Sequence, residues 1–242
     1  MIDCKVFADK AAASGWAASQ ICDMIRDNPT ANLGVATGSS PADVYAEIAR
    51  QVHADSIDVT HLRAFALDEY LGLDTTHPQS YHYFIDEHVT KQIGLAPQNV
   101  RVPFAEGHST GDVIDDYDAE IADAGGIDLQ ILGIGSNGHI AFNEPGTPFD
   151  SVTHVEPLTQ STRADNRRFF DHTAEVPILS VTQGIGTIMN ARRIILLAFG
   201  ENKAEAVRDS VRGPVTEDVP ASVLQNHPNV VFALDEAAAS LL

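Results

Sequence analysis

The sequence predicts a three-layer α/β domain in which helices cover both faces of a mainly parallel, open, Rossmann-like sheet. Short apolar runs alternate with helical patterns along the 242 residues, as in repeated βαβ units. The runs at 127–134 and 193–199 are almost entirely apolar, as expected of strands buried on both faces. No proline-, glycine- or serine-rich linker divides the chain, so residues 1–242 are predicted to form a single domain.

The individual elements follow from hydrophobic periodicity and from the residues that bound each segment. Strands are expected at 5–7, 33–37, 62–67, 127–134, 193–199 and 230–234. Helices are expected at 9–27, 41–52, 80–88, 112–124, 182–190, 201–211 and 220–226, and Asp235 can cap a short terminal helix. Asp9 is a suitable N-cap for the first helix, and Pro41 suits the first position of the second.

Residues from about 151 to 175 form a long segment with no clean period. The segment is polar and rich in arginine. We expect it to lie as a lid over the carboxyl ends of the strands, where open α/β sheets bind ligands.

The composition indicates an ordinary globular protein. Hydrophobic residues make up 44% of the chain, enough to bury a large core at this length. The two cysteines, Cys4 and Cys22, suit neither a disulfide framework nor a metal motif. The chain begins without an apolar signal core and has no run of the ~18 apolar residues that a spanning helix needs. We therefore expect a cytoplasmic protein with no membrane partner.

The formal net charge is −19, from 15 basic and 34 acidic side chains. Such a surface repels nucleic acids and anionic membranes, so neither is expected as a partner. An acidic shell can reflect adaptation to high salt, but many cytoplasmic enzymes are acidic, and we favour the second explanation. Because lysines are few, a basic residue inside a motif points to an anionic ligand.

The stretch Ile127–Phe149 is the most informative part of the chain. A predicted strand runs into Gly133, Gly135 and Gly138, which spell the G-x-G-x-x-G pattern of dinucleotide-binding loops. That loop needs a helix to begin at its third glycine, whereas here Asn143-Glu144-Pro145-Gly146-Thr147-Pro148 soon follows and ends any helix. A nicotinamide or flavin cofactor is therefore not expected.

Asn137, His139 and Glu144 lie on this loop, at the carboxyl end of the strand. A histidine beside a carboxylate is suited to moving protons near neutral pH. On chemistry alone, the pair could equally be a surface histidine and a surface glutamate on a glycine-rich turn.

The loop sequence GIGSNGHIAFNEPG is very similar to the active-site signature of glucosamine-6-phosphate deaminases (isomerases). Further blocks resemble this family in the same order: ATGSSP at 36–41, LDEYLGL at 67–73, HPQSYHYF at 77–84, STRADNRRFF at 161–170 and LAFGENKAEAV at 197–207. The resemblance covers nearly the whole chain. It implies an enzyme of amino-sugar catabolism that converts glucosamine 6-phosphate and water to fructose 6-phosphate and ammonia, as an isomerase that also hydrolyses a carbon–nitrogen bond.

The segment Thr37-Gly38-Ser39-Ser40 lies between a predicted strand and a predicted helix, where backbone N–H groups and hydroxyls can hold an anion. The alternative is an ordinary turn whose serine caps the helix. The resemblance implies that the segment binds the substrate phosphate together with Arg168 and Lys203. We interpret the nearby Arg163 and Arg167 as lid surface.

Asp68 and Glu69 directly follow a predicted strand. A partly buried carboxylate in that place can serve as a general base, although an acidic surface turn is the commoner case. The resemblance implies that Asp68 takes the proton from carbon 2 of the sugar, with Glu69 and Tyr70 shaping the pocket.

The resemblance also implies that His139, Glu144 and Asn137 open the sugar ring. His139 would move a proton between the ring oxygen and the anomeric hydroxyl, while Glu144 orients and stabilises the imidazole. Many family members carry aspartate where this chain has Asn137. An amide oxygen can still accept a hydrogen bond from the ring N–H, so we expect Asn137 to be an orienting residue.

No cofactor and no metal are expected. His77, His82 and His88 are five and six residues apart, so no i, i+4 pair shares a helix face, and no cysteine accompanies them. His77 lies in the block HPQSYHYF, where we expect it to pack in the core or to support residues that contact the substrate.

Some family members are hexamers that N-acetylglucosamine 6-phosphate activates through basic residues after the N-E-P loop and a longer C-terminal tail. Here Val152-Thr153-His154-Val155-Glu156 carries an acid in that place and the chain ends at Leu242. We therefore expect a non-allosteric monomer or low-order homo-oligomer.

Parts of the sequence are also compatible with two other functions. A 6-phosphogluconolactonase, a hydrolase with a related fold, could use the same glycine-rich loop, but the N-E-P and T-R-x-x-N-x-R-F-F patterns favour the deaminase. A non-catalytic sugar-phosphate sensor domain of a transcription regulator would need a DNA-binding element, and none is visible in this acidic chain.

Overall fold

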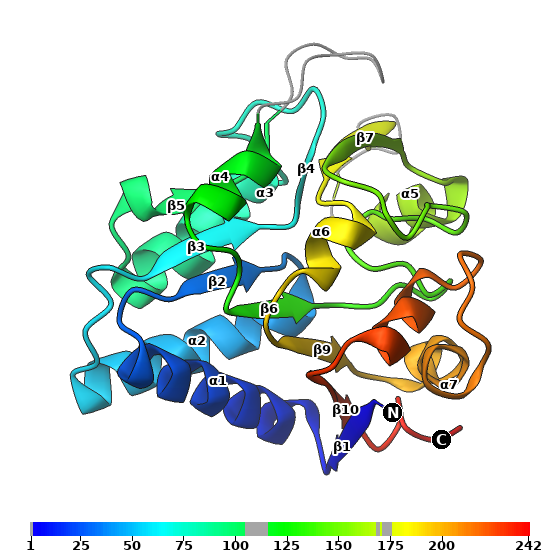
Figure 1. The fold of residues 1–242 in the computed structure, drawn as a ribbon, viewed down its shortest axis with the longest axis horizontal. Coiled ribbons are helices and arrows are strands. Elements are labelled where there is room, and N and C mark those ends of the chain that lie inside the picture. The colour runs from blue at the N-terminus through cyan, green and yellow to red at the C-terminus, as the bar shows by residue number, and fades with distance from the viewer. Residues whose placement is uncertain (1, 105–115, 168–169, 171–175) are drawn as a thin grey trace.

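A seven-stranded parallel sheet forms the centre of the molecule (Figure 1). The structure is a computed structural model that describes residues 2–104, 116–167, 170 and 176–242. The strands of the sheet are β1 (Asp3–Phe7), β2 (Asn32–Val35), β3 (Arg63–Ala66), β5 (Val100–Arg101), β6 (Leu129–Leu132), β9 (Ile194–Ala198) and β10 (Val230–Asp235). Their order is β1-β10-β9-β6-β2-β3-β5, and all neighbours pair in parallel.

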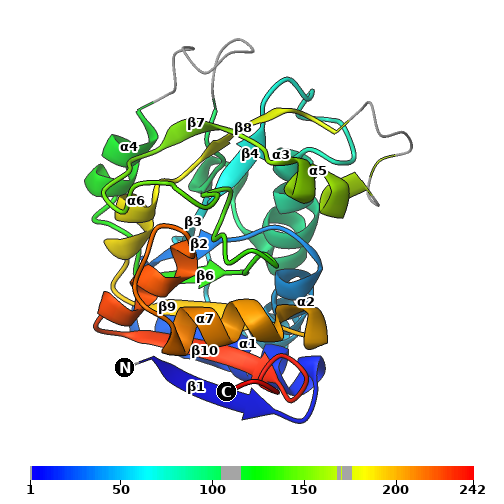
Figure 2. The same ribbon diagram turned by 90° about the vertical axis from the view of Figure 1, so that its right-hand side faces the viewer.

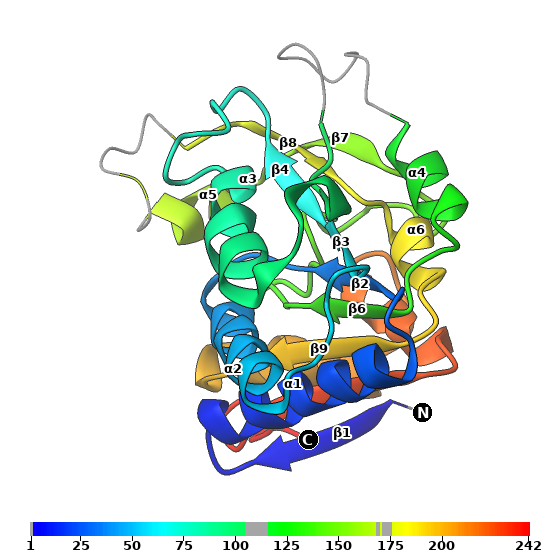
Figure 3. The same cartoon turned by 90° about the vertical axis from the view of Figure 1, so that its left-hand side faces the viewer.

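Helices cover both faces of this sheet. They are α1 (Lys10–Asp27), α2 (Ser39–Asp55), α3 (Tyr81–Ile85), α4 (Tyr117–Asp123), α5 (Gln160–Asn166), α6 (Ile185–Met189) and α7 (Ala204–Arg212). Figure 3 shows α1, α2 and α3 in front of one face, and Figure 2 shows α6 and α7 on the opposite side. The predicted three-layer α/β architecture is therefore confirmed.

The inner strands and the first helix supply much of the core. Every residue of β2, β6 and β9 is buried, as their apolar sequences predict. Helix α1 buries Ile21 and Ile25 completely, and each such side chain contributes about 1.5–3 kcal/mol by leaving water. The predicted cap of α1 is confirmed, because the Asp9 carboxylate accepts a hydrogen bond from Ala12 N at 2.8 Å.

The chain reverses its direction across the sheet between β2 and β6. From β2 it proceeds outward through β3 to β5, and from β6 it proceeds the other way through β9 to β10. The two strands are neighbours, with Leu33 opposite Leu129 and Gly34 opposite Gln130. The loops after β2 and β6 therefore diverge at the carboxyl edge of the sheet and leave a crevice, the usual place for a ligand in open α/β folds.

A second, antiparallel sheet lies beyond β3 (Figure 2) and contains β4 (Asp68–Tyr70), β8 (Leu179–Thr182) and β7 (His154–Pro157), in that order. The region predicted as a lid, about 151–175, thus contains a strand and helix α5 where the sequence shows no period. The prediction of a helix from residue 182 is wrong at its start, because Thr182 ends β8 and α6 begins at Ile185. Strands this short carry little periodic signal, and their partners are remote in the sequence.

Several helix ends also differ from the predictions. Helix α2 begins at Ser39 with Gly38 as its N-cap, so Pro41 is the third helical residue rather than the first. A proline is tolerated there because N–H groups of the first turn have no partner within the helix. The helix predicted at 80–88 is α3, which continues as a π-helical segment over Asp86–Gly94.

Other predicted helices are only partly confirmed. The helix predicted at 220–226 is a 3-10 helix, Pro220–Asn226. Asp235 accepts a hydrogen bond from Ala238 N at 2.8 Å, but the residues that follow form turns rather than the expected terminal helix. Helix α4 covers the second half of the helix predicted at 112–124, whose first residues lie outside the described part of the chain. Among the described residues, no helix combines the length and apolarity needed to cross a membrane.

Candidate functional site

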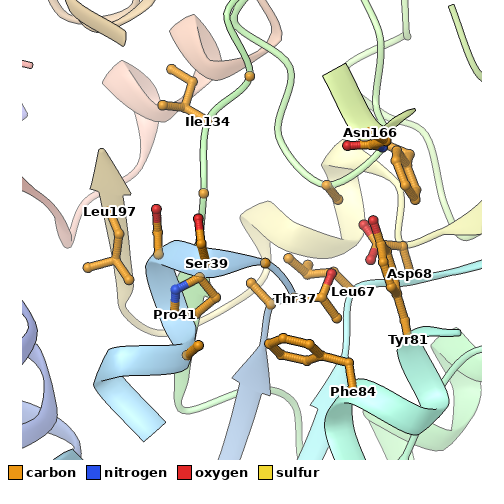
Figure 4. Close-up of a pocket in the computed structure, with 18 of the residues that line it drawn as sticks. Thr37, Ser39, Pro41, Leu67, Asp68, Tyr81, Phe84, Ile134, Asn166 and Leu197 are labelled. Carbon is orange, nitrogen blue, oxygen red and sulfur yellow. The ribbon is translucent and has the colours of Figure 1, made fainter. Parts of the chain in front are cut away.

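A pocket of about 410 Å³ opens at the carboxyl ends of β2, β6 and β9 (Figure 4). Residues from all six sequence blocks that resemble the family meet in it. The predicted site residues that line it are Thr37, Gly38, Ser39, Ser40, Asp68, His139 and Lys203. The crevice at the reversal of strand order is thus the place where the predicted anion loop, base and histidine come together.

The loop between β2 and α2 forms one wall of the pocket. Gly38, the N-cap of α2, has φ +106°, a conformation that favours glycine, and no side chain caps the first turn. The alternative of an ordinary turn capped by a serine is therefore not what the structure shows. Lys10 donates a hydrogen bond from Nζ to the Ser39 carbonyl at 2.8 Å and holds the loop from outside. The N–H groups at the start of this 17-residue helix form a positive end suited to an anion.

The basic residues predicted beside this loop have different outcomes. Lys203 lines the pocket from the 3-10 turn Glu201–Lys203 that follows β9. Arg168 lies outside the described residues. Arg163 is not simply lid surface, because it is partly buried and its Nη2 donates to the Val176 carbonyl at 3.2 Å.

Asp68 lies at the bend where the chain leaves the parallel sheet and enters the antiparallel one. It pairs with Thr182 of β8. Gln183 binds the carbonyls of the two residues before Asp68, that of Leu67 through N at 2.7 Å and that of Ala66 through Nε2 at 3.0 Å. The Asp68 side chain is only 5% exposed and still lines the pocket beside Tyr81 (Figure 4). The alternative of an acidic surface turn is therefore excluded.

The protonation of Asp68 is perturbed in the direction that a general base needs. Burial raises the pKa of its carboxyl well above the ordinary value of 3.8, and the neighbouring charge of Glu69 raises that pKa further. A carboxylate with a raised pKa is a stronger base once it has lost its proton, so Asp68 is suited to proton abstraction.

Glu69 and Tyr70 act differently from one another. Glu69 does not line the pocket: its carboxylate accepts hydrogen bonds from Ser80 Oγ at 2.7 Å, Tyr81 N at 2.9 Å and His82 N at 2.8 Å. It therefore fixes the start of α3 and, with it, the Tyr81 ring. Tyr70 does line the pocket, and burial raises the pKa of its phenol to about 12, so it stays neutral.

His139 lies with its ring against Gly135. A Cβ atom at residue 135 would come within 2.3 Å of the imidazole, so glycine is required there. The ring lines the pocket, and its Nδ1 lies 3.7 Å from Oε2 of Glu144, within ion-pair range but too far for a hydrogen bond. Among the described residues Nδ1 has no hydrogen-bond partner, and Glu144 is the acidic side chain within ion-pair range of it.

Asn137 orients this pair, but not in the predicted way. Its Oδ1 accepts a hydrogen bond from the backbone N–H of His139 at 3.2 Å, rather than from the ring. Its Nδ2 donates to Oε2 of Glu144 at 2.9 Å. The prediction failed at this point because the tight turn places the amide oxygen under the backbone of the histidine.

Glu144 stands behind the imidazole and is only 2% exposed. Burial by itself raises its pKa, but the facing imidazole and the hydrogen bonds from Thr162 and Asn137 outweigh burial and hold that pKa at about 2. Glu144 is therefore a fixed negative charge that can orient and stabilise a protonated ring.

Sequence reasoning missed several residues of the site. Thr159 and Thr162 donate to Glu144 from the start of α5, and Asn166 at its end donates to the Tyr70 hydroxyl at 2.9 Å. Tyr81 also lines the pocket. All but Thr159 lie inside sequence blocks that resemble the family, which is the signal that could have found them.

Two of the three histidines between residues 77 and 88, His77 and His88, pack against aromatic rings. His77 stacks on Phe170 with ring centroids 6.3 Å apart, and His88 lies 4.3 Å from Phe84. Within the described part of the chain, no group of three or more potential metal ligands is present.

A helix start suited to an anion, a buried carboxyl with a raised pKa and a histidine–carboxylate pair around one pocket define a class of protein: an α/β enzyme with a site suited to a small anionic substrate and to proton transfer. Residues 7–232 match the model of a family described as glucosamine-6-phosphate isomerases/6-phosphogluconolactonase. The chain belongs to this family.

The deaminases named below are more similar in sequence to this chain than the lactonase is. Relatives named glucosamine-6-phosphate deaminase include one from Pseudarthrobacter chlorophenolicus, 50% identical over 93% of this chain and 87% of its own, and one from Rhodopirellula baltica, 46% identical over 100% and 96%. The solved structure of a monomeric glucosamine-6-phosphate deaminase is 37% identical, with a TM-score of 0.93 over the whole of both chains. A 6-phosphogluconolactonase from Trypanosoma cruzi is 22% identical with a TM-score of 0.79 over 100% of this chain and 97% of its own, and shares the fold.

Proposed function

We propose that this pocket deaminates glucosamine 6-phosphate, converting it with water to fructose 6-phosphate and ammonia. The observation that carries the proposal is that Asp68 and His139 line the same pocket, which begins at the anion loop of α2. The deaminase names of relatives at 46–50% identity support this substrate.

The phosphate binds at the end of the pocket formed by Thr37-Gly38-Ser39-Ser40. Backbone N–H groups of α2 donate to its oxygens, and Lys203 adds a positive charge across the pocket. Arg168 is proposed as a further ligand. Since the chain carries a net charge of −19, these groups supply the local positive potential that an anionic sugar needs.

Ring opening is assigned to His139. The imidazole takes the proton of the anomeric hydroxyl and delivers it to the oxygen of the sugar ring. Glu144 stabilises the imidazole while it carries this proton and is positively charged. Asn137 holds Glu144 and the backbone of the histidine in place. The product of this step is an open-chain aldehyde.

Isomerisation and deamination follow at carbons 1 and 2. Asp68 removes the proton from carbon 2 to give an enolamine and returns a proton to carbon 1, which leaves an imine at carbon 2. Water adds to that carbon, and the carbon–nitrogen bond breaks to release ammonia. The net reaction therefore hydrolyses a carbon–nitrogen bond, although its proton transfers are those of an aldose–ketose isomerase. Neither a metal nor a cofactor takes part in the proposed scheme.

We also propose a cytoplasmic enzyme of one domain that acts as a monomer or low-order oligomer without allosteric activation. The similar structure of a monomeric deaminase supports this proposal. So does Glu156, which pairs with His154 at 3.2 Å and places an acid on β7. A sigmoidal rate curve that became hyperbolic with N-acetylglucosamine 6-phosphate would contradict it.

The direct test measures ammonia and fructose 6-phosphate in parallel from glucosamine 6-phosphate. We expect equal amounts of the two products. If neither forms while 6-phosphogluconolactone is hydrolysed, the protein is a lactonase. If the sugar phosphate binds without reaction, the pocket is a sensor.

A further inference from the structure

Glu144 is held by a helix remote from its own loop. Its Oε2 faces Asn137 and His139, on the loop after β6. Its Oε1 is directed at the start of α5, where it accepts hydrogen bonds from the hydroxyls of Thr159, at 3.1 Å, and Thr162. One carboxylate thus connects the histidine to the lid.

The two threonine hydroxyls are not equivalent. Each has a single proton to donate. The hydroxyl of Thr159 caps α5 by accepting from Thr162 N at 3.2 Å. It can direct its proton to Glu144 or to Thr162 Oγ1, at 3.1 Å in both cases, or to Ser161 Oγ at 2.9 Å. The hydroxyl of Thr162 is buried and has Glu144 as the acceptor of its proton. Thr162 is therefore the committed donor.

The other end of α5 reaches the pocket. Asn166, on the last turn, lines the pocket and donates from Nδ2 to the Tyr70 hydroxyl at 2.9 Å. Tyr70 in turn packs against Tyr81, with ring centroids 4.7 Å apart. Helix α5 therefore contacts the carboxylate behind the histidine at one end and the aromatic wall near Asp68 at the other.

We propose that Thr162 is a positioning residue that fixes Glu144 for its work on His139 and so ties the folded lid helix to the proton-moving pair. This inference rests on the roles proposed above for the histidine and the glutamate. Without the Thr162 hydroxyl, Oε1 of Glu144 keeps only the longer hydrogen bonds from Thr159, at 3.1 Å from the hydroxyl and 3.4 Å from the backbone N–H. The carboxylate is then held less firmly, and the imidazole faces a less fixed partner. Turnover falls, whereas substrate binding at the anion loop is unaffected.

Other charged groups near Glu144 do not replace this contact. His139 is the titratable group that faces the carboxylate, from the same loop. On α5, the Arg163 guanidinium is directed to the Val176 carbonyl. From the loop before the 3-10 helix Pro220–Asn226, Glu217 accepts from Phe149 N at 3.3 Å. The hydroxyl of Thr162 is thus a main reason why a carboxylate this deeply buried keeps its charge.

The test compares Thr162→Val, Thr162→Ser and, as a matched control, Thr153→Val. Thr153 is a buried threonine near β7 whose hydroxyl has no hydrogen-bond partner among the described residues, so its loss should change nothing. Steady-state kinetics separate kcat from KM. Because Asp68 also titrates in the pocket, the fall in rate at low pH cannot be assigned to Glu144 alone. Carbon-13 NMR of labelled glutamate carboxyls, with Glu144→Gln for assignment, follows Glu144 directly.

We expect Thr162→Val to lower kcat about tenfold and to leave KM within about twofold. The buried carboxylate has lost a donor, so its pKa rises. Glu144 therefore begins to take up a proton at a higher pH than in the parent protein, and its carbon-13 chemical shift begins to change at that higher pH. Thr162→Ser restores both quantities, and Thr153→Val matches the parent. If Thr162→Val does not fold, Thr162→Ala carries the same test.

The inference is overturned if kcat or the titration of Glu144 is unchanged in a folded Thr162→Val, or if the serine variant is as impaired as the valine variant. A parent protein that releases no ammonia is a different result. In that case the proposed function fails, while a shifted Glu144 titration in Thr162→Val still establishes the positioning contact.

Discussion

Replacing Asp68 with asparagine separates its catalytic role from its effect on stability. Asparagine has nearly the same shape but cannot take up a proton. General base catalysis contributes on the order of 10²–10⁴ in rate, so kcat should fall by two to four orders of magnitude. Binding of the sugar phosphate, which we propose depends on the anion loop and Lys203, should change little.

The same substitution should stabilise the fold at neutral pH. Burial raises the pKa of Asp68 above its ordinary value of 3.8, so the folded protein holds this proton more tightly than the unfolded chain does. Stability is therefore lost as pH rises from the unfolded pKa through the folded one. Each pKa unit between the folded and unfolded values corresponds to about 1.4 kcal/mol of unfolding free energy. For a chain of this size, each kcal/mol shifts Tm by roughly 2–4 °C.

The assay is ammonia release together with thermal melting of parent and Asp68→Asn at pH 8 and pH 4.5. We expect a melting advantage for Asp68→Asn at pH 8 that shrinks at pH 4.5, where the carboxyl of the parent is closer to neutral. Near-normal turnover would refute the assignment of the base. A gain in Tm that is equal at both pH values would refute the argument from burial.

Three further predictions concern the loop and the surface. In Gly135→Ala the new Cβ would lie 2.3 Å from the His139 ring, so turnover should fall at least 100-fold in a folded protein. Gly15→Ala is the control, because a Cβ at this position of helix α1 meets nothing within 4 Å. It should keep full activity and gain about 0.5–1 kcal/mol in unfolding free energy. Asn137→Asp should keep activity within about tenfold, and a complete loss would contradict its orienting role. If the acidic surface is not a salt adaptation, Tm should change by only a few degrees between low and molar salt, and a large rise would indicate a halophile.

Features that depend on neighbouring residues, such as buried strands, helix caps and turns, could be predicted from the sequence. The apolar runs located β2, β6 and β9, and the cap at Asp9 located the start of α1. The segment Thr37-Gly38-Ser39-Ser40 could be placed between a strand and a helix because glycine and small polar residues mark such turns. Strand ends of this kind meet at one edge of a parallel sheet, so a shared pocket was predictable.

Contacts between remote segments could not be predicted in the same way. The β4-β8-β7 sheet, which buries Asp68, is made of strands of three or four residues with polar side chains. Its pairing of Asp68 with Thr182 has no local signature. The hydrogen bond from the Thr162 hydroxyl to Glu144 likewise depends on where helix α5 packs against the loop after β6. The contacts of Asn137 depend on the turn of its own backbone.

The central claim is that Asp68 takes the proton from carbon 2 before ammonia leaves. Glucosamine 6-phosphate carrying deuterium at carbon 2, followed by NMR through a full turnover, tests it most directly. The account predicts a ketose product, with the deuterium released to solvent or carried to carbon 1, and no such reaction in Asp68→Asn. An aldose product that has lost ammonia but retains deuterium at carbon 2 would show direct displacement of the amine and would contradict the account.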